Sequence, residues 1–437
     1  MRKLVSGLSL ALVGSLQLAG CAGSDSGPAE DCLPGDIECS SGGGDGKSDG
    51  FDYKNDPERM SQNLNYRLDE LPRNGKLTSP VWKDKFPEAV GKVPVAWTDT
   101  YWPTYQGSHN ARWLGPTVKS PMEKYDAAFN GAAGCETQPE AICGFGAKAA
   151  WDTYYGCAGP AASWQSQYFQ DAGIMHDGID NNYDGLVDEC EGDEGADGIA
   201  TWWGTCHAWT PASLSVPEPQ RAVTVNGVTF EVADIKALAQ NIYDQADAVM
   251  LGGRCNSQHI THDVNGSAND DCADVNPGAL HVILANFLGI AQLPLIEDRT
   301  ANFEVWNQPV VAYDVLTQTE TTPEAANICV GNTGSTWTYN PEAVQLFDVS
   351  TTVSYITEGR ASARPLGFEP NYIRRDRYHY ILEVGATGKV IGGRFCQDSA
   401  NTHVDFLWSP TGEFQPSNPN IDKALVLDLI AKSVAPE

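Results

Sequence analysis

Apolar and polar positions divide the chain into a short leader, a polar stretch and a long body. Met1-Arg2-Lys3 is basic and is followed by a mostly apolar run over 4–18, which is too short and too interrupted to span a bilayer. Residues 21–50 are rich in Gly, Ser and Asp and lack the apolar positions needed to fold, which predicts a flexible tether. The pattern therefore predicts a leader over 1–20, a tether over 21–50 and one folded domain over 51–437.

Hydrophobic periodicity in the body changes between the helical and the strand repeat, which predicts an α+β fold. Residues 52–117 show little periodicity and are rich in Pro, Trp and Tyr, so we expect an irregular segment packed across the core. Helical spacing occurs over 121–130, 147–170 (interrupted at Gly159-Pro160) and 235–250, and alternation over 222–230, which predicts a hairpin around Asn226-Gly227.

The leader ends in Leu18-Ala19-Gly20-Cys21, which has the form of a bacterial lipobox with cleavage before Cys21. This predicts an exported protein whose mature chain begins at a lipidated cysteine. We expect a lipoprotein of the outer membrane or cell surface of a Gram-negative bacterium, attached to the membrane through its lipid anchor only.

Charge and cysteine content restrict the function further. The chain carries 28 Lys+Arg against 57 Asp+Glu, a formal charge of −29, which makes nucleic acid and anionic lipid surfaces poor partners. Setting aside a lipidated Cys21 and a nucleophilic Cys206 leaves ten of the twelve cysteines, enough for five disulfides. Proximity in the sequence suggests the pairs Cys135–Cys143, Cys157–Cys190 and Cys255–Cys272.

The segment Thr201-Trp202-Trp203-Gly204-Thr205-Cys206-His207-Ala208-Trp209 places one cysteine among small and aromatic residues. We interpret Cys206 as a nucleophile, which requires a histidine or a helix N-terminus to stabilise the thiolate. Gly204 would admit a substrate backbone and Thr205 would cap a helix beginning at the cysteine. Pro211 and Pro217 leave room for only a short or kinked helix. The alternative is a buried structural or disulfide-bonded cysteine.

A second motif, over 180–191, has the oxygen and glycine spacing of an EF-hand calcium loop. Glycine at the sixth position permits the sharp turn, and a glutamate at the twelfth closes the shell. The expected ligands are Asp180, Asn182, Asp184, the Leu186 carbonyl, Asp188 and Glu191. An acidic solvated turn is the alternative, and flanking helices are not evident. The loop also resembles the aspartate-rich calcium repeats of secreted bacterial proteins.

Two later stretches carry possible partners for Cys206. His281 lies inside the apolar run 276–289, so it is either a satisfied core residue or a catalytic base. Asn307 lies in Phe303-Glu304-Val305-Trp306-Asn307-Gln308-Pro309-Val310. His403, with Asp405 close behind it, is a rival base if the sheet brings the C-terminal strands to the cleft.

The order Cys206, His281, Asn307 resembles the catalytic series of papain-like enzymes, in which Asn orients the imidazole. The sequence from Val305 to Val310 resembles the start of the surface peptide of the Phytophthora transglutaminase elicitor. The stretches 378–384, 388–393 and 398–408 resemble the C-terminal strands of bacterial members of that family. The resemblance to the transglutaminase elicitor family extends over about 52–408.

The resemblance implies a calcium-dependent protein-glutamine γ-glutamyltransferase with a papain-like core, in which a helix bearing Cys206 packs on an antiparallel sheet contributing His281 and Asn307. Cys206 would be the nucleophile, His281 the base and acid, and Asn307 the residue that orients His281. Ala200 stands where papain has its oxyanion glutamine, so the Cys206 amide and an indole N–H would replace it. The cleft walls would be Trp202, Trp203 and Trp306.

The expected partners are proteins with accessible Gln and Lys side chains, and the expected cofactor is calcium. Two other function classes stay open. The same residues suit a papain-like thiol peptidase, amidase or deamidase. A non-catalytic, calcium-ordered surface lipoprotein that binds a partner through its Trp-rich cleft is the third hypothesis.

Overall fold

The structure is a computed structural model of the whole chain. It describes residues 50–51, 54–139, 152–171, 201–245, 247–253, 274–301, 304–367, 370–400, 402–411 and 414–436. Within these ranges no helix is long and apolar enough to cross a membrane.

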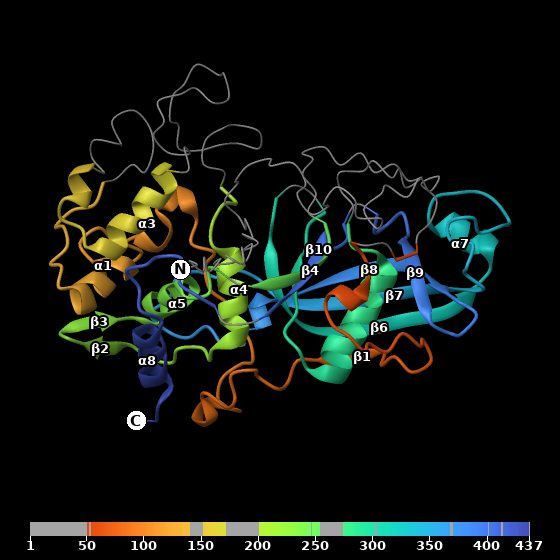
Figure 1. Cartoon of the computed structure of the whole chain (residues 1–437), viewed down its shortest axis with the longest axis horizontal. Coiled ribbons are helices and arrows are strands. Elements are labelled where there is room, and N and C mark those ends of the chain that lie inside the picture. The colour runs from red at the N-terminus through yellow and green to blue at the C-terminus, as the bar shows by residue number, and fades with distance from the viewer. Residues whose placement is uncertain are drawn as a thin grey trace, which may run out of the picture.

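An antiparallel sheet with the strand order β4-β10-β5-β6-β7-β8-β9 forms one half of the molecule (Figure 1). β1 pairs with β6 beside this path, and β2 and β3 form a separate hairpin. The strands are β1 (Asn74–Lys76), β2 (Val223–Val225), β3 (Val228–Phe230), β4 (Ala248–Gly252), β5 (Ile296–Asp298), β6 (Asn307–Thr321), β7 (Gln345–Ile356), β8 (Ile373–Val384), β9 (Val390–Phe395) and β10 (Phe406–Pro410). The predicted mixture of helices and an antiparallel sheet is confirmed.

Helices α1, α3, α5 and α8 gather on the other half, α4 lies between them and the sheet, and α6 and α7 pack on the sheet itself (Figure 1). The helices are α1 (Pro121–Tyr125), α3 (Pro160–Asp171), α4 (Cys206–Ser215), α5 (Val232–Asn241), α6 (Pro277–Leu284), α7 (Pro323–Cys329) and α8 (Lys423–Val434). Short π segments follow α1 (Asp126–Asn130) and α6 (Ala285–Ala291), and 3-10 turns occupy Pro57–Arg59, Pro87–Ala89, Thr104–Gln106, Ser108–Asn110 and Pro370–Tyr372. α4 packs on β6 and α5, whereas α6 packs on β8 and β9.

Several sequence predictions are confirmed by these elements. The hairpin turns at Asn226 and Gly227, both with positive φ, and α3 starts directly after Gly159. The irregular segment before α1 does cross the core. The Trp97 indole N–H donates to the Val216 carbonyl at 3.0 Å, and the Trp209 indole N–H donates to the Trp97 carbonyl at 3.1 Å. Because Trp97 and Trp209 are fully buried, these bonds hold α4 against the extended segment.

Two predicted elements are wrong. The apolar run around His281 belongs to helix α6 and not to the sheet, because Asn276 caps its N-terminus and Pro277 occupies the first turn. The predicted helix over 235–250 ends at Asn241, and Ala248–Gly252 instead pairs with β10. Ala248, Val249 and Met250 are compatible with a helix or a strand. They form a strand because their backbone pairs with the edge of β10.

The disulfides differ from those suggested by sequence proximity. Cys135 pairs with Cys157 and Cys329 with Cys396. The suggested pairs Cys135–Cys143 and Cys157–Cys190 are therefore wrong, because the turn before α3 returns Cys157 to Cys135. The suggested Cys255–Cys272 pair lies outside the described residues. The predicted leader and the predicted tether up to residue 49 lie outside them as well.

Candidate active site

Cys206 is the first residue of α4 and is fully buried. The stretch that leads into β6 lies against this cysteine. The Cys206 Sγ atom is 3.5 Å from the Val305 carbonyl oxygen and 3.5 Å from Asn307 Nδ2. The structure thus brings two residues together that are about a hundred positions apart in the chain. A sulfur at a helix N-terminus beside an amide N–H is placed where a thiolate would be stabilised.

Asn307, the first residue of β6, is held by the neighbouring sheet. Trp408 on β10 donates its indole N–H to Asn307 Oδ1 at 2.7 Å, which leaves the amide nitrogen directed at the sulfur. Asn307 and Trp408 are 2% and 1% exposed, so both orientations are set by packing. Asn307 therefore contacts the nucleophile candidate itself, and no hydrogen bond joins it to His281.

Cys206 is disulfide-bonded, so the prediction of a free thiol is wrong for this state of the protein. The other four described cysteines pair with each other, and the partner of Cys206 therefore lies outside the described residues. With Cys21 set aside for lipidation, eleven cysteines remain, and a bonded Cys206 with some other cysteine free preserves the count, so the count does not distinguish the two states of Cys206. The structure is that of an oxidised form, in which the sulfur cannot act as a nucleophile.

Gly204 serves a different purpose from the one expected. A Cβ atom at Gly204 would lie 2.4 Å from the Tyr101 carbonyl oxygen and 2.5 Å from the Tyr101 ring, so only glycine fits. That same carbonyl accepts the Thr205 amide N–H at 2.6 Å. Gly204 thus lets the extended segment approach the start of α4, and room for a substrate is not its evident role.

Thr205 occupies the N-cap position of α4, but its side chain makes no capping bond. Its hydroxyl instead donates to Gln240 Oε1 at 2.7 Å, and Gln240 Nε2 donates to Asp99 Oδ2 at 2.8 Å. His109 Nε2 lies 3.4 Å from the same hydroxyl. Burial lowers the pKa of His109 to about 4 and raises that of Asp99 to about 7. This buried polar network behind Cys206 spans widely separated segments, so no local sequence signal indicated it.

The three predicted cleft tryptophans have different surroundings. Trp202 is buried and Trp203 half-buried, with their rings perpendicular and 6.1 Å apart. The Trp203 indole nitrogen is buried and has no hydrogen-bond partner among the described residues. The half-buried Trp306 donates its indole N–H to Glu304 at 2.8 Å and meets the Tyr101 ring edge-on at 5.4 Å.

Neither candidate base contacts the sulfur. His281 on α6 is 3% exposed, and its Nδ1 pairs with the Tyr380 hydroxyl at 2.9 Å. Burial lowers the pKa of His281 to about 4, so the ring is neutral. His403 pairs through Nε2 with Asp274 and through Nδ1 with the Ser399 carbonyl at 3.1 Å. These contacts are those of core histidines, which is one of the two interpretations that the sequence left open for His281.

His207, which follows the cysteine directly, does point away from it, as expected. Its Nε2 lies 2.9 Å from Asp244 Oδ1. A different imidazole, that of His109, lies 3.4 Å from the Thr205 hydroxyl, although the sequence placed His109 in an irregular segment without any functional signal. Only the packing of that segment against α4 brings His109 to Thr205.

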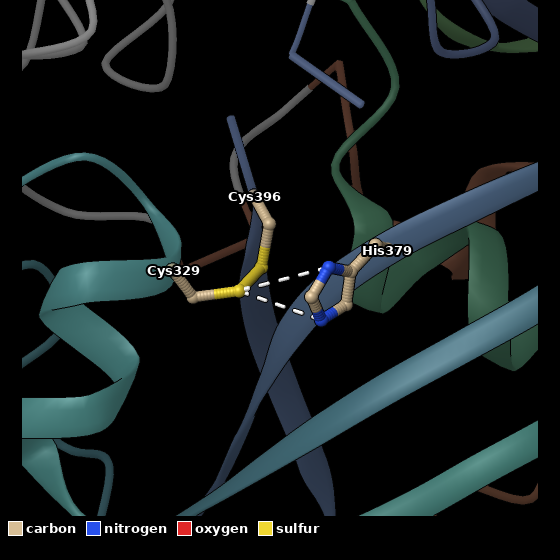
Figure 2. A group of neighbouring side chains, drawn as sticks. All are labelled: Cys329, His379 and Cys396. Carbon is tan, nitrogen blue, oxygen red and sulfur yellow. Dashed lines mark hydrogen bonds between the residues drawn. A yellow bond between two sulfur atoms is a disulfide. The ribbon is translucent and has the colours of Figure 1, made fainter. Parts of the chain in front are cut away.

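The predicted metal and lipid sites lie outside the described residues: Cys21 and the loop with Asp180, Asn182, Asp184, Leu186, Asp188 and Glu191. Within the described part, one group could offer metal ligands, namely Cys329, His379 and Cys396 (Figure 2). Its two sulfurs are bonded to each other, and His379 nitrogens lie 3.0 Å from Asp348 and 3.2 Å from Asp398. With both thiols oxidised and both nitrogens occupied, this group is a covalent tie between α7 and the end of β9.

Comparisons with known proteins identify a family and a similar solved structure. The family model "Transglutaminase elicitor" matches residues 170–429. Among solved structures, the chain is similar to the crystal structure of the GP42 transglutaminase from Phytophthora sojae, with 29% sequence identity and a TM-score of 0.60. The match covers 85% of this chain and 94% of that one. A search of curated proteins finds no match.

The matched residues include Cys206, Asn307 and Trp408 and all the strands from β4 to β10. The family model spans more than half of the chain, and the structural match extends over nearly all of the relative. The chain therefore belongs to the transglutaminase elicitor family.

Proposed function

We propose that this protein is a protein-glutamine γ-glutamyltransferase with a papain-like core and Cys206 as its nucleophile. The observation that supports this most directly is the pairing of Cys206 Sγ with Asn307 Nδ2 at 3.5 Å, at the point where a helix N-terminus meets the start of a strand. Family membership and the likeness to a transglutaminase structure support the same activity.

The oxidised sulfur adds an activation step to the proposal. A dithiol must first reduce the Cys206 disulfide, and in doing so becomes a disulfide itself while two thiols form in the protein. The positive end of α4 and the Asn307 amide then favour the thiolate of Cys206. The protein as exported would be latent until such a reductant reaches it.

The reaction then follows the chemistry of a cysteine acyltransferase. The thiolate attacks the carboxamide carbon of a glutamine, the S–C bond forms, the C–N bond breaks, and ammonia leaves after taking a proton from an acid in the site. The Trp203 N–H and the first-turn amides of α4 would bind the oxyanion. A neutral lysine amine attacks the thioester carbonyl carbon, the amide C–N bond forms, the C–S bond breaks to release the Cys206 thiolate, and the proton lost by the amine passes to a base in the site.

Calcium and a lipid anchor remain sequence-based parts of the proposal. Asp180, Asn182, Asp184, Leu186, Asp188 and Glu191 supply the oxygen donors that a calcium ion prefers. Cys21 would carry the anchor of an exported lipoprotein, and its substrates would be proteins presenting Gln and Lys.

The test is incorporation of dansylcadaverine into dimethylcasein with release of ammonia, using protein treated with a dithiol in the presence of calcium. We expect activity after reduction, none in the oxidised protein and none in Cys206→Ala. Ammonia without amine incorporation would indicate a deamidase or thiol hydrolase. No ammonia from reduced protein would favour the calcium-ordered binding protein.

A set of histidine-to-alanine variants identifies the residue that transfers the proton. His281→Ala abolishes turnover if His281 is the base; if it is a core residue bonded to Tyr380, the variant is less stable but retains its turnover per folded molecule. His403→Ala makes the same distinction for the rival base. His259 and His262, which lie outside the described residues, complete the panel.

A further inference from the structure

Two aromatic rings lie on the segments that form the candidate site. The residues on either side of Trp306 contact Cys206 Sγ, each at 3.5 Å, so the Trp306 backbone passes beside the candidate nucleophile. Tyr101, whose carbonyl binds the Thr205 amide, meets this indole edge-on at 5.4 Å. Both rings are half-buried and therefore keep part of their surface accessible.

Two carboxylates flank these rings. Glu304 accepts the Trp306 indole N–H at 2.8 Å, and Glu358 accepts bonds from Gln308 and, at 2.8 Å, from the Thr357 hydroxyl. Burial raises the pKa of Tyr101 to about 12, and the nearby charges of Glu358 and Glu304 add to the shift. Both carboxylates therefore lie within electrostatic reach of the Tyr101 hydroxyl.

The cluster holds a buried acceptor that the described residues leave unsatisfied. Gln308 is 1% exposed, and its Oε1 atom has no hydrogen-bond partner among those residues, although Nε2 of the same amide binds Glu358. Among the described residues Glu358 forms no ion pair. Two carboxylates, an unpaired amide oxygen and two aromatic faces together are suited to one class of ligand, a cation that carries N–H donors.

We propose that Tyr101, Trp306, Glu304 and Glu358 form the subsite that captures the cationic ammonium group of the acyl acceptor, the lysine side chain or a primary amine. This rests on the proposed function and deepens it, because it separates recognition of the acceptor from recognition of the glutamine donor. Bound beside Cys206, the ammonium is concentrated at the thioester before it loses a proton and attacks.

The test compares a cationic with a neutral acceptor in reduced protein. Hydroxylamine is uncharged at neutral pH, whereas dansylcadaverine carries an ammonium. In the double variant Glu304→Gln, Glu358→Gln we expect KM for dansylcadaverine to rise about 5- to 10-fold, the size of a lost cation site, and KM for hydroxylamine to change less than about twofold. Added salt should raise KM for dansylcadaverine in the wild type and much less in the double variant.

Glu320→Gln is the matched control, since it removes one carboxylate from the exposed far end of the same strand, β6. It should leave both KM values unchanged. Equal rises for both acceptors, or no rise for either, would overturn the subsite. An effect on calcium dependence alone would assign the carboxylates to a metal ion and would also overturn it.

A second measurement needs no turnover. Equilibrium dialysis of cadaverine with the oxidised protein should show binding that the double variant loses and Glu320→Gln keeps. If reduced wild-type protein releases no ammonia, the proposed function fails, and the dialysis result still decides whether the cation subsite exists. Absence of cadaverine binding together with an unchanged KM would refute the subsite while leaving the transferase intact.

Discussion

Replacing Asp99 with asparagine should remove a pH-dependent cost of folding from the network behind Cys206. Asp99 is 1% exposed; its Oδ2 accepts bonds from Gln240 at 2.8 Å and Trp102 at 3.3 Å, and its Oδ1 has no partner in the described part of the chain. Burial raises the pKa of Asp99 from 3.8 to about 7, although Lys236 opposes the shift. The folded protein therefore holds a proton that the unfolded chain has already released.

The sign and the size follow from this shift. The pKa of Asp99 is higher in the folded than in the unfolded protein. Its contribution therefore lowers the free energy of unfolding as pH rises from about 4 to about 7 and stays constant above that. At about 1.4 kcal/mol per pH unit, the full cost is about 4 kcal/mol above pH 7. About 3 kcal/mol of it accumulates between pH 5 and pH 8.

Urea unfolding at pH 5 and pH 8, with disulfides intact, measures this difference. Asparagine keeps the shape of Asp99 and an acceptor oxygen for Gln240 and Trp102 but does not titrate. In the wild type we expect the free energy of unfolding to be about 3 kcal/mol lower at pH 8 than at pH 5 because of Asp99. In Asp99→Asn this difference should be absent. Asp84→Asn, the same change at an exposed residue, should keep it. Parallel pH profiles for wild type and Asp99→Asn would refute the argument.

Three further predictions concern the neighbouring residues. Gly204→Ala places a Cβ atom 2.4 Å from a carbonyl oxygen and should lower stability by about 1–3 kcal/mol in urea; an unchanged midpoint would contradict the close approach. Trp408→Phe leaves the buried Asn307 oxygen without its donor, which should cost about 1–3 kcal/mol and slow amine incorporation; a wild-type midpoint and rate would count against this role. Asp184→Ala with Glu191→Gln should lower activity at sub-millimolar calcium while the circular dichroism spectrum stays unchanged, whereas equal wild-type activity in EGTA and calcium would argue against a regulatory ion.

Much of the local structure could be predicted from the sequence because its causes are local. Asn226-Gly227 accepts the positive φ of a tight hairpin, Gly159-Pro160 interrupts the helix before α3, and α4 runs through Pro211 and is capped at its C-terminus by Val216, the residue before Pro217. The C-terminal stretches that resemble the strands of the family form β8, β9 and β10, as the resemblance implied. The apolar run around His281 was harder, since a short apolar run is compatible with either a strand or a helix, and its capping residues decide for α6.

The sequence by itself determined the mixed fold class, the position of Cys206 at a helix start and its relation to Asn307 through a family pattern. Only the tertiary structure decided which partners these residues meet. It placed Asn307 on the sulfur, His281 on Tyr380 and Gly204 against Tyr101, and it paired Cys206 in a disulfide. The contacts of Asn307, His281 and Gly204 each join segments far apart in the chain, and such contacts depend on how the sheet and helices pack, for which a local pattern carries no information.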